Sequence, residues 1–346
     1  MVTDIPVSDI VDKQAIPGDE GQTEVRTRRL GRRILVLTNM YPDPPRRPVL
    51  GIFVKEQVES LRQLGLDVDV LFVDGPGNKL NYALGFIRLW ARLLRKKYDL
   101  IHAHYVFSAA IALAQPRLPV VTTFHSGEVL LGSFQRILSQ QVSKRVRLNI
   151  AVSEEVRTKL NGKTCVIPCG VDTTRFFPAD KDAARKRLSL PTDKRLVLFA
   201  AAMRPEKRFE LVKASCSILK ERMPNSELVV LTNQPPELVP VFMNACDVLV
   251  LASQKEGSPQ VVKEALACNL PVVSTNVGDV EDLIGDVPGC RIAEPNATDI
   301  ADKLHQVLAA GKRIEARRKA EDLSLRKIAE RISQKYEEAL TSGTKV

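Results

Sequence analysis

Two glutamates, Glu256 and Glu264, lie eight positions apart in the segment EGSPQVVKEAL, and their carboxylates could bind or act on a polar ligand. The apolar run DVLVLAS before Glu256 is typical of a buried strand, and the residues after Pro259 follow a helical apolar period. In an open parallel sheet, ligands bind beyond the carboxyl ends of the strands, where helix N-termini offer free N–H groups to anions. The spacing therefore predicts a ligand site at this strand-to-helix turn.

The helix of this turn would place the second glutamate beside the ligand. We expect Ser258 to be its N-cap and Pro259 to occupy its first position. Gln260 and Glu264 would share one face, where a carboxylate can accept hydrogen bonds from two vicinal hydroxyls such as those of a ribose. The buried stripe would consist of Val261, Val262, Ala265 and Leu266.

The two glutamates are also compatible with two alternative roles. A glutamate on a helix is usually a solvated surface group. A pair of carboxylates can also hydrolyse a glycosidic bond, but a retaining glycosidase needs them ~5.5 Å apart across a sugar ring. Two glutamates from one turn are more easily arranged along a ligand than across it.

The rest of the chain supplies the elements that would position this turn. At 346 residues the chain exceeds the usual size of a single core, which predicts two domains. Apolar runs alternate with helical periods in residues 31–170 and 194–320, as expected for two doubly wound parallel sheets. Residues 171–193 suit an interdomain linker, and residues 321–346 predict a C-terminal helix that packs back on the N-terminal domain. Residues 1–30 predict a disordered basic tail.

Composition restricts the class of protein. The net charge of +10 favours an anionic partner, and the six cysteines form no Cys-x-x-Cys pair, as expected of reduced, buried thiols. No apolar run reaches the ~18 residues that a membrane span needs. We expect a cytoplasmic protein, and a peripheral position at the inner membrane face is an open alternative.

One basic amphipathic segment could reach a membrane. Residues 79–99 alternate leucine, phenylalanine, isoleucine and tryptophan with arginine and lysine. Such a segment can lie on an anionic membrane surface, or it can be a core-facing helix with a solvated basic rim. Nucleic acid is not an expected partner, because no recognised binding module accompanies the charge.

Several motifs together resemble one known family. The E-x7-E motif EGSPQVVKE is followed by ALACNLPVVSTNVGDVEDLI, and VIPCGVDTTRFFP and TTFHSGE occur upstream. Over residues 31–340 the sequence resembles the retaining glycosyltransferases of family 4. That resemblance implies an α/β protein of the GT-B fold, in which two Rossmann-like doubly wound parallel-sheet domains face a central cleft.

The resemblance also implies roles for particular residues. Glu264 would hold the ribose of a nucleotide sugar, Glu256 would lie near the donor sugar, and His125 would lie near sugar and acceptor. A core histidine bonded to a backbone carbonyl is the alternative for His125. The donor-binding set would be completed by Gly257, Ser258, Pro259, Gln260 and Val261. Gly51 and His104 are candidates on the acceptor side.

Fixed cations would be needed beside the diphosphate, because negative charge grows on its oxygens as the sugar leaves. AAMRPEKRF supplies Arg204 for bidentate contact and Lys207 as a point charge. Most relatives carry Gly-Arg after this strand, and here Ala202 stands in the place of that arginine. Arg204 would therefore act from another backbone position, with Arg208 as a second candidate, and a merely solvated basic loop is the alternative.

A second departure from the family is length, since the chain passes from SELVVLTN almost directly into PPELVPVFMNACDVLVLAS. This interval is too short for the β-α unit that helps to frame the nucleotide base in relatives. His102 and His104 would share a strand face, but no third ligand at metal-site spacing is visible.

We therefore expect a retaining glycosyltransferase that moves a sugar from a nucleoside-diphosphate sugar to a glycan, lipid-linked or small-molecule hydroxyl acceptor. Biosynthesis of cell-envelope material, exopolysaccharide, glycolipid or another glycoconjugate is the expected setting. The nucleotide sugar is a co-substrate, and the family resemblance implies neither a cofactor nor a metal. The alternative is a non-catalytic GT-B scaffold that binds nucleotide or a partner protein without transfer, and an epimerase or phosphorylase is a lesser one.

Overall fold

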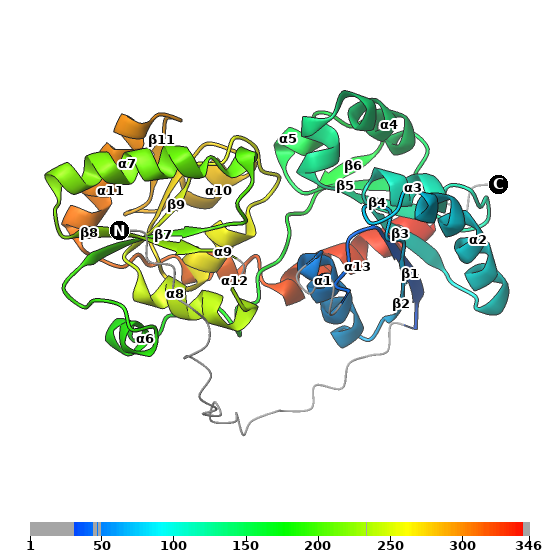
Figure 1. Ribbon diagram of the computed structural model, residues 1–346. Helices are drawn as coiled ribbons and strands as arrows, with labels where there is room; N and C mark the ends of the chain where they lie inside the picture. Colours follow the sequence, from blue (N-terminus) through cyan, green and yellow to red (C-terminus); the bar gives the residue numbers. More distant parts are fainter. Residues whose placement is uncertain (1–30, 44–46, 48–49, 233, 342–346) are drawn as a thin grey trace, which may run out of the picture. The chain divides into compact units, whose positions relative to one another are not determined.

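The computed structural model describes residues 31–43, 47, 50–232 and 234–341. These residues form two compact α/β units, each with its own parallel sheet (Figure 1). The N-terminal unit holds residues 31–170, residues 256–258 and the chain from residue 323 on. The C-terminal unit holds residues 171–255 and 259–322. The tail 1–30, expected to be disordered and basic, lies outside the described residues.

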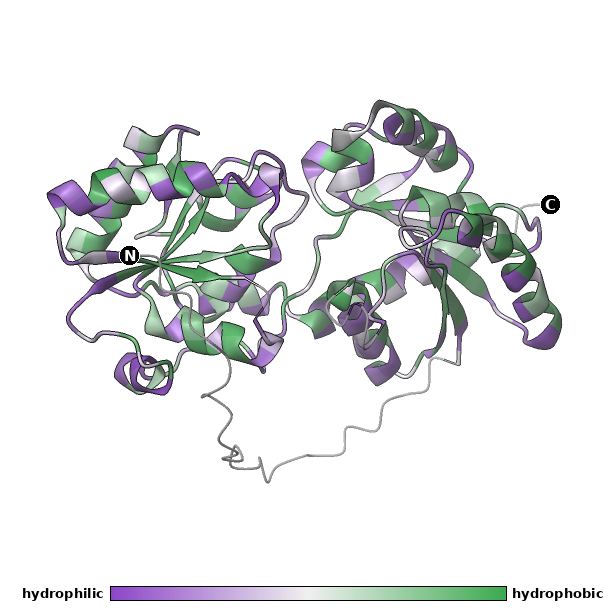
Figure 2. Cartoon of the chain, viewed as in Figure 1, coloured by the Kyte–Doolittle hydropathy of each residue, from purple (hydrophilic) through white to green (hydrophobic). Residues whose placement is uncertain are grey.

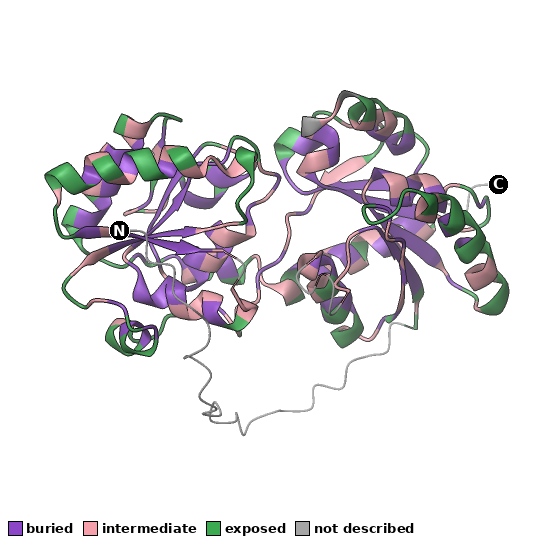
Figure 3. Cartoon of the chain, viewed as in Figure 1, coloured by how far each residue is buried: buried purple, intermediate pink, exposed green. Residues whose placement is uncertain are grey.

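Within the described residues, six parallel strands form the sheet of the N-terminal unit, in the order β2-β1-β3-β4-β5-β6. These strands are β1 Arg33–Thr38, β2 Asp67–Phe72, β3 Leu100–His104, β4 Val120–Phe124, β5 Leu148–Ala151 and β6 Thr164–Val166. The central strands β3 and β4 are buried along their whole length (Figure 3). Continuous burial is expected of parallel strands that have helices on both faces.

Helices cover both faces of this sheet because neighbouring residues of each strand point to opposite sides. Ile34 and Val36 share a core with α1 and α13, whereas Leu35 and Leu37 share another with α2, α3 and α4. The helices are α1 Ile52–Gln63, α2 Leu80–Arg95, α3 Val106–Ala112, α4 Ser133–Ser143, α5 Glu154–Arg157 and α13 Leu325–Thr341, with the π-helix η2 Gly127–Leu131.

The sheet of the C-terminal unit has five strands within the described residues, in the order β11-β10-β9-β7-β8. They are β7 Arg195–Ala200, β8 Ser226–Leu231, β9 Val248–Leu251, β10 Val272–Thr275 and β11 Arg291–Ala293. Edge strand β8 is followed by the short helix η4 Pro236–Leu238 and by α8 Val239–Ala245, and the chain then enters β9. The structure thus has no further β-α unit between β8 and β9 in its described residues, as the short segment predicts.

Helices again cover both faces of the sheet (Figure 1). Helices α7 and α11 pack together over a core that includes Val197, Phe199 and Val250. On the other face, α9 packs against both α8 and α12. The remaining helices of this unit are α6 Lys181–Arg187, η3 Pro205–Lys207, α7 Phe209–Arg222, α9 Gln260–Ala267, α10 Val280–Ile284, α11 Ala297–Ala310 and α12 Arg317–Glu321.

The segment 171–193, expected to be an interdomain linker, lies in the C-terminal unit and contains α6. Buried Arg185 of this helix donates to the Ala245 carbonyl at 2.9 Å and to the Asp247 carboxylate at 2.7 Å. Asp247 also accepts from the backbone N–H of Leu196, the second residue of β7, at 2.7 Å. These bonds attach the segment to the sheet of the C-terminal unit.

Both sheets are mostly hydrophobic, and polar residues gather on the outer faces of the helices (Figure 2). None of the six cysteines forms a disulfide in the structure, and three are buried as expected (Cys246, Cys268 and Cys290), whereas Cys165, Cys169 and Cys216 are half-buried. Burial raises the pKa of Cys246 to about 12, so this thiol stays protonated at neutral pH.

Candidate functional site

The turn between β9 and α9 carries the first glutamate of the E-x7-E motif. Strand β9 is wholly buried, and the chain leaves it through a loop in which Glu256 and Ser258 are half-buried. Pro259 is the N-cap residue of α9, with an extended ψ of 114°, and the helix begins at Gln260. The expectation of a Ser258 cap and a helical Pro259 is therefore wrong by one position, because Pro259 keeps an extended backbone.

The second glutamate lies on α9 as expected, but the buried face of this helix differs from the predicted one. Gln260 and Glu264 are both half-buried, whereas Val261, expected in the core, is also only half-buried. The residue that is fully buried instead is Lys263. The remaining buried residues of α9 are Val262, Ala265, Leu266 and Ala267.

Lys263 is a charged residue that sequence reasoning missed. Its Nζ lies 3.9 Å from Oδ2 of Asp279 and 3.5 Å from Oε1 of Gln260. Asp279 is the N-cap residue of α10 and is itself buried. The signal was present in the sequence as a lysine inside the apolar run QVVKEALA, together with an aspartate after the next strand. Attraction between the two charges links the start of α10 to α9.

The basic loop after β7 lies next to the loop that leads to Glu256. The backbone N–H of Gln254 donates to the carbonyl of Glu206 at 2.8 Å, which joins the two loops at the carboxyl ends of β7 and β9. Lys207 is half-buried in η3, and Arg204, just before η3, is exposed, with its guanidinium 4.0 Å from the Glu206 carboxylate. The C-terminal unit thus places two cations near the carboxyl ends of β7 and β9.

Arg208, the second candidate cation, is half-buried and has a left-handed backbone with φ 51°. It is the N-cap residue of α7. A left-handed conformation is uncommon outside glycine, and here it allows the chain to turn from η3 directly into α7. The position of Arg208 is therefore explained by the turn itself.

Three histidines gather at the carboxyl ends of β3 and β4 in the N-terminal unit. His104 ends β3, His125 directly follows β4, and Nδ1 of His104 lies 3.4 Å from Nε2 of His125. The His102 and His104 rings share one strand face, with centroids 4.5 Å apart. His102 Nδ1 lies 2.6 Å from the Tyr336 hydroxyl of α13, and its Nε2 lies 2.8 Å from the Thr123 hydroxyl.

All three imidazoles are neutral at physiological pH. Burial lowers the pKa of His102 and of His125 to about 3, and burial lowers the pKa of His104 well below its usual value. In the neutral form each ring has one N–H donor and one acceptor nitrogen. The cluster can therefore form hydrogen bonds of defined direction, but it carries no positive charge for a phosphate.

Glu128, another residue that sequence reasoning missed, forms a hydrogen bond to the backbone of His125. One carboxylate oxygen accepts from the His125 backbone N–H at 2.9 Å, and the other accepts from the Val106 N–H. Burial raises the pKa of this carboxyl group to about 8, although both backbone hydrogen bonds lower it. Tyr105, directly before Val106, has φ 70°, so Glu128 stabilises a strained turn after β3.

The acceptor-side candidate Gly51 lies at the start of α1. Its φ is 66°, and a Cβ added there would lie 2.4 Å from the carbonyl carbon of Met40, so the position requires glycine. The Phe53 ring of α1 has its centroid 5.1 Å from that of His125, and Gln57 Nε2 lies 3.4 Å from His104 Nε2. The structure thus brings the start of α1 to the two histidines that end β3 and β4.

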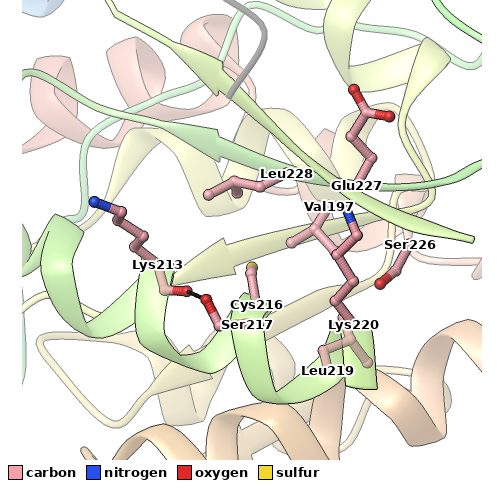
Figure 4. Close-up of a pocket in the computed structure, with 9 residues that line it drawn as sticks. All are labelled: Val197, Lys213, Cys216, Ser217, Leu219, Lys220, Ser226, Glu227 and Leu228. Carbon is pink, nitrogen blue, oxygen red and sulfur yellow. Dashed lines mark hydrogen bonds between the residues drawn. The ribbon is translucent and has the colours of Figure 1, made fainter. Parts of the chain in front are cut away.

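A pocket of about 210 Å³ lies elsewhere in the C-terminal unit, between α7 and strands β7 and β8 (Figure 4). Lys213 and Lys220 of α7 and Glu227 of β8 line it, with Cys216 between the lysines along the helix. None of the residues expected to bind the donor lines this pocket. Within the residues that the structure describes, no group of three or more histidine, cysteine, aspartate or glutamate side chains could hold a metal ion.

Two family models match the chain. Residues 26–175 match Glycosyltransferase Family 4, and residues 225–322 match Glycosyl transferases group 1. Among curated proteins, the Bacillus subtilis (strain 168) protein TuaC, named for a glycosyltransferase of teichuronic acid biosynthesis, is 28% identical over 344 aligned residues. That match covers 79% of this chain and 88% of TuaC.

Solved structures share the fold. Sucrose-phosphate synthase from Thermosynechococcus elongatus superposes with a TM-score of 0.79 at 18% identity, covering 90% of this chain and 100% of that one. The Anabaena protein HepE in complex with UDP has a TM-score of 0.65 at 17% identity, covering 88% of this chain and 100% of that one. Two parallel-sheet α/β units with these neighbours constitute the GT-B fold.

Proposed function

We propose that this chain, which belongs to glycosyltransferase family 4, transfers a sugar from a nucleoside-diphosphate sugar to a hydroxyl acceptor with retention of anomeric configuration. The observation that carries the proposal is the hydrogen bond from Gln254, two residues before the E-x7-E motif, to Glu206 of the basic loop. It supports a donor site at the carboxyl ends of β7 and β9 in the C-terminal unit, because α/β sheets bind ligands at this edge. HepE, which shares the fold, is known in complex with UDP and with UDP-glucose.

Each donor residue has a chemical task in this proposal. Lys207 and Arg204 stabilise the negative charge that grows on the diphosphate as the sugar leaves, because fixed charges need no reorganisation during the reaction. Glu264 accepts hydrogen bonds from the ribose hydroxyls, and Glu256 accepts from a hydroxyl of the donor sugar. The backbone N–H groups that begin α9 lie next to the sugar and the phosphates. The loop cations act in place of a metal ion, so transfer is independent of metal.

The acceptor residues belong to the N-terminal unit. His125 and His104 end adjacent strands, and Gly51 opens the helix that meets them. The leaving phosphate deprotonates the incoming hydroxyl on the same face of the sugar, which accounts for retention without a side-chain base. The name of TuaC supports an acceptor in cell-envelope polysaccharide synthesis.

Binding of nucleotides tests the donor site. A saturating donor at ~100 times its dissociation constant stabilises a protein by about 2.7 kcal/mol, which a melting curve resolves. We expect one nucleoside diphosphate to raise the melting temperature of the wild type and of Lys186→Ala, a control at an exposed lysine of α6. Glu264→Ala and the double variant Arg204→Ala/Lys207→Ala should lose the shift. A rise in melting temperature that persists in both variants would contradict the proposed donor site.

We also propose that α2 binds an anionic membrane surface reversibly. Its apolar side chains Leu80, Ile87 and Leu94 are 70%, 67% and 83% exposed. Leu84, Phe86 and Trp90 add further exposed area. Arg88, Arg92 and Arg95 on the same helix would each contribute about 1 kcal/mol near acidic lipids. Among the described residues, no helix is both long and apolar enough to cross a membrane.

Helix α4 of the same unit also exposes apolar side chains. It packs, as α2 does, against α3, and its Phe134 and Ile137 are 69% and 57% exposed. Sedimentation with vesicles that contain acidic lipid tests the surface. Ile87→Asn/Leu94→Asn should lose binding, whereas Phe177→Asn, which removes an exposed apolar side chain of the C-terminal unit, should retain it. Equal binding of both variants would exclude the surface.

Two observations favour a second candidate function, a non-catalytic scaffold that binds nucleotide. Ala202 replaces the arginine that most relatives carry, and the sheet of the C-terminal unit ends at β8. A scaffold would bind a nucleoside diphosphate but release none from any nucleotide sugar. Normal biological activity of Glu256→Ala and Lys207→Ala variants would favour it over the enzyme.

A further inference from the structure

A hydrogen-bonded chain runs from α1 through two histidines in the N-terminal unit. The side-chain amide Nε2 of Gln57 lies 3.4 Å from Nε2 of His104. On the other side of the same ring, Nδ1 of His104 lies 3.4 Å from Nε2 of His125. Both histidines are buried, and Gln57 is half-buried. The chain therefore connects a helix to the candidate acceptor residue through one intervening ring.

The first bond sets the direction of the second. With the Gln57 amide in this orientation its nitrogen faces the ring and can only donate, so Nε2 of His104 accepts and carries no proton. A neutral imidazole then has its proton on Nδ1, and His104 donates from that atom to Nε2 of His125. His125, whose Nε2 is now an acceptor, must carry its own proton on Nδ1. The neutrality of both rings follows from burial, which lowers both pKa values.

Packing prevents His125 from rotating away from this arrangement. The Tyr105 ring stacks on the imidazole with ring centroids 4.5 Å apart, and the centroid of the Phe53 ring lies 5.1 Å from that of the imidazole. Its backbone N–H is held by Glu128 at 2.9 Å. The orientation of the ring and its tautomer are therefore both determined by neighbours within the same unit.

We propose that Gln57 and His104 are positioning residues that hold His125 in the Nδ1–H tautomer, so that His125 meets a substrate oxygen as a hydrogen-bond donor. The substrate in this statement rests on the proposed glycosyltransferase function, whereas the tautomer does not. Because the lone pair on Nε2 already accepts from His104, His125 has none left to take a proton from the acceptor hydroxyl. His125 is therefore not a general base in this enzyme.

Replacement of the Gln57 amide by a carboxylate should reverse the direction of both hydrogen bonds. In Gln57→Glu the carboxylate accepts from Nε2–H of His104, whose Nδ1 then accepts from Nε2–H of His125. The side chain keeps nearly the same shape, so the tautomer changes without a large change in packing. Glu59→Gln is the matched control, because it makes the opposite exchange at an exposed position of the same helix.

Nitrogen-15 NMR of the imidazoles reads the tautomers directly. The chain has four histidines, so the signals lost in His102→Asn and His305→Asn leave those of the His104 and His125 pair. We expect both to be protonated on Nδ1 in the wild type and in Glu59→Gln, and the site of protonation to change in Gln57→Glu. Protonation of either ring on Nε2 in the wild type, or an unchanged spectrum in Gln57→Glu, would overturn the assignment.

Kinetics separate this inference from the proposed function. Gln57→Glu should lower kcat about tenfold, as for the loss of one hydrogen bond, with unchanged affinity for the nucleoside diphosphate. A reversed tautomer with unchanged kcat would refute the positioning role. If NMR shows the predicted tautomers but the protein transfers no sugar, the glycosyltransferase function is refuted and the tautomer assignment stands.

Discussion

Glu128 should make the stability of the N-terminal unit decrease as the pH rises above neutral. Its pKa is raised by burial from 4.5 to about 8 in the folded protein. The folded state therefore binds more protons than the unfolded state between these two values, so stability is lost as the pH rises through that window. At 1.36 kcal/mol per pKa unit, Glu128 removes about 2 kcal/mol of stability between pH 6.5 and 8.

The three buried histidines act in the opposite direction over an overlapping pH range. Their pKa values are lowered by burial from 6.5, so stability increases as the pH rises through about 6 to 7.5, where the histidines of the unfolded state lose their protons. Because Glu128→Gln keeps all three histidines, comparison of this variant with the wild type isolates the contribution of Glu128.

Urea unfolding followed by tryptophan fluorescence provides the assay. Trp90 is the single tryptophan of the chain and lies on α2, so the signal reports the unit that contains Glu128. Relative to Glu128→Gln, the free energy of unfolding of the wild type should fall by about 2 kcal/mol between pH 6.5 and 8. The Glu128→Gln variant cannot ionise at this position and should lack that loss. Parallel profiles of the two proteins would refute the account of the buried carboxyl group.

Three further substitutions test the packing around the site. Lys263→Met should destabilise the C-terminal unit by about 3 kcal/mol by removing the ammonium group 3.9 Å from the buried Asp279 carboxylate, and Lys263→Met/Asp279→Asn should recover most of the loss in a melting curve. Gly51→Ala should cost more than about 1 kcal/mol in urea, because of its positive φ and the clash with Met40, whereas Gly132→Ala should change stability by less than about 0.5 kcal/mol. An equal cost at the two glycines would contradict the role of the positive φ. Tyr336→Phe should cost about 1–3 kcal/mol by removing a hydrogen-bond partner of buried His102, and no change in the urea midpoint would contradict that bond.

The fold was predictable because its signals are local and repeated. Apolar runs such as VVTTF and DVLVLAS predicted buried parallel strands, and the structure confirms the α/β sheets of the GT-B fold. The family was predictable from the E-x7-E motif, and the family matches confirm it. The predicted start of α9 was one residue too early. Proline is common at the first helical position, but Pro259 has an extended ψ and is the N-cap residue instead.

The residues that escaped prediction depend on contacts between segments distant in sequence. Lys263 and Asp279 are charged residues that a sequence pattern places at the surface, and the structure buries both together. Glu128 follows a strand in TTFHSGE, but only the fold shows that its carboxylate reaches Val106, 22 positions earlier in the chain. The bond between His102 and Tyr336 joins residues 234 positions apart. No periodicity in the sequence encodes such pairings.

The release of nucleoside diphosphate from nucleotide sugars is the measurement that tests the central claim most directly. Purified protein would be mixed with a panel of nucleotide sugars and a lipid and glycan extract as acceptor, and the diphosphate product would be quantified. We expect one donor to be consumed by the wild type and by Lys186→Ala. The Arg204→Ala/Lys207→Ala variant should be slower by about a hundredfold or more, because it lacks both cations beside the leaving group. Equal rates in this variant, or no release from any donor by the wild type, would contradict the assignment of the chain as a glycosyltransferase with this donor site.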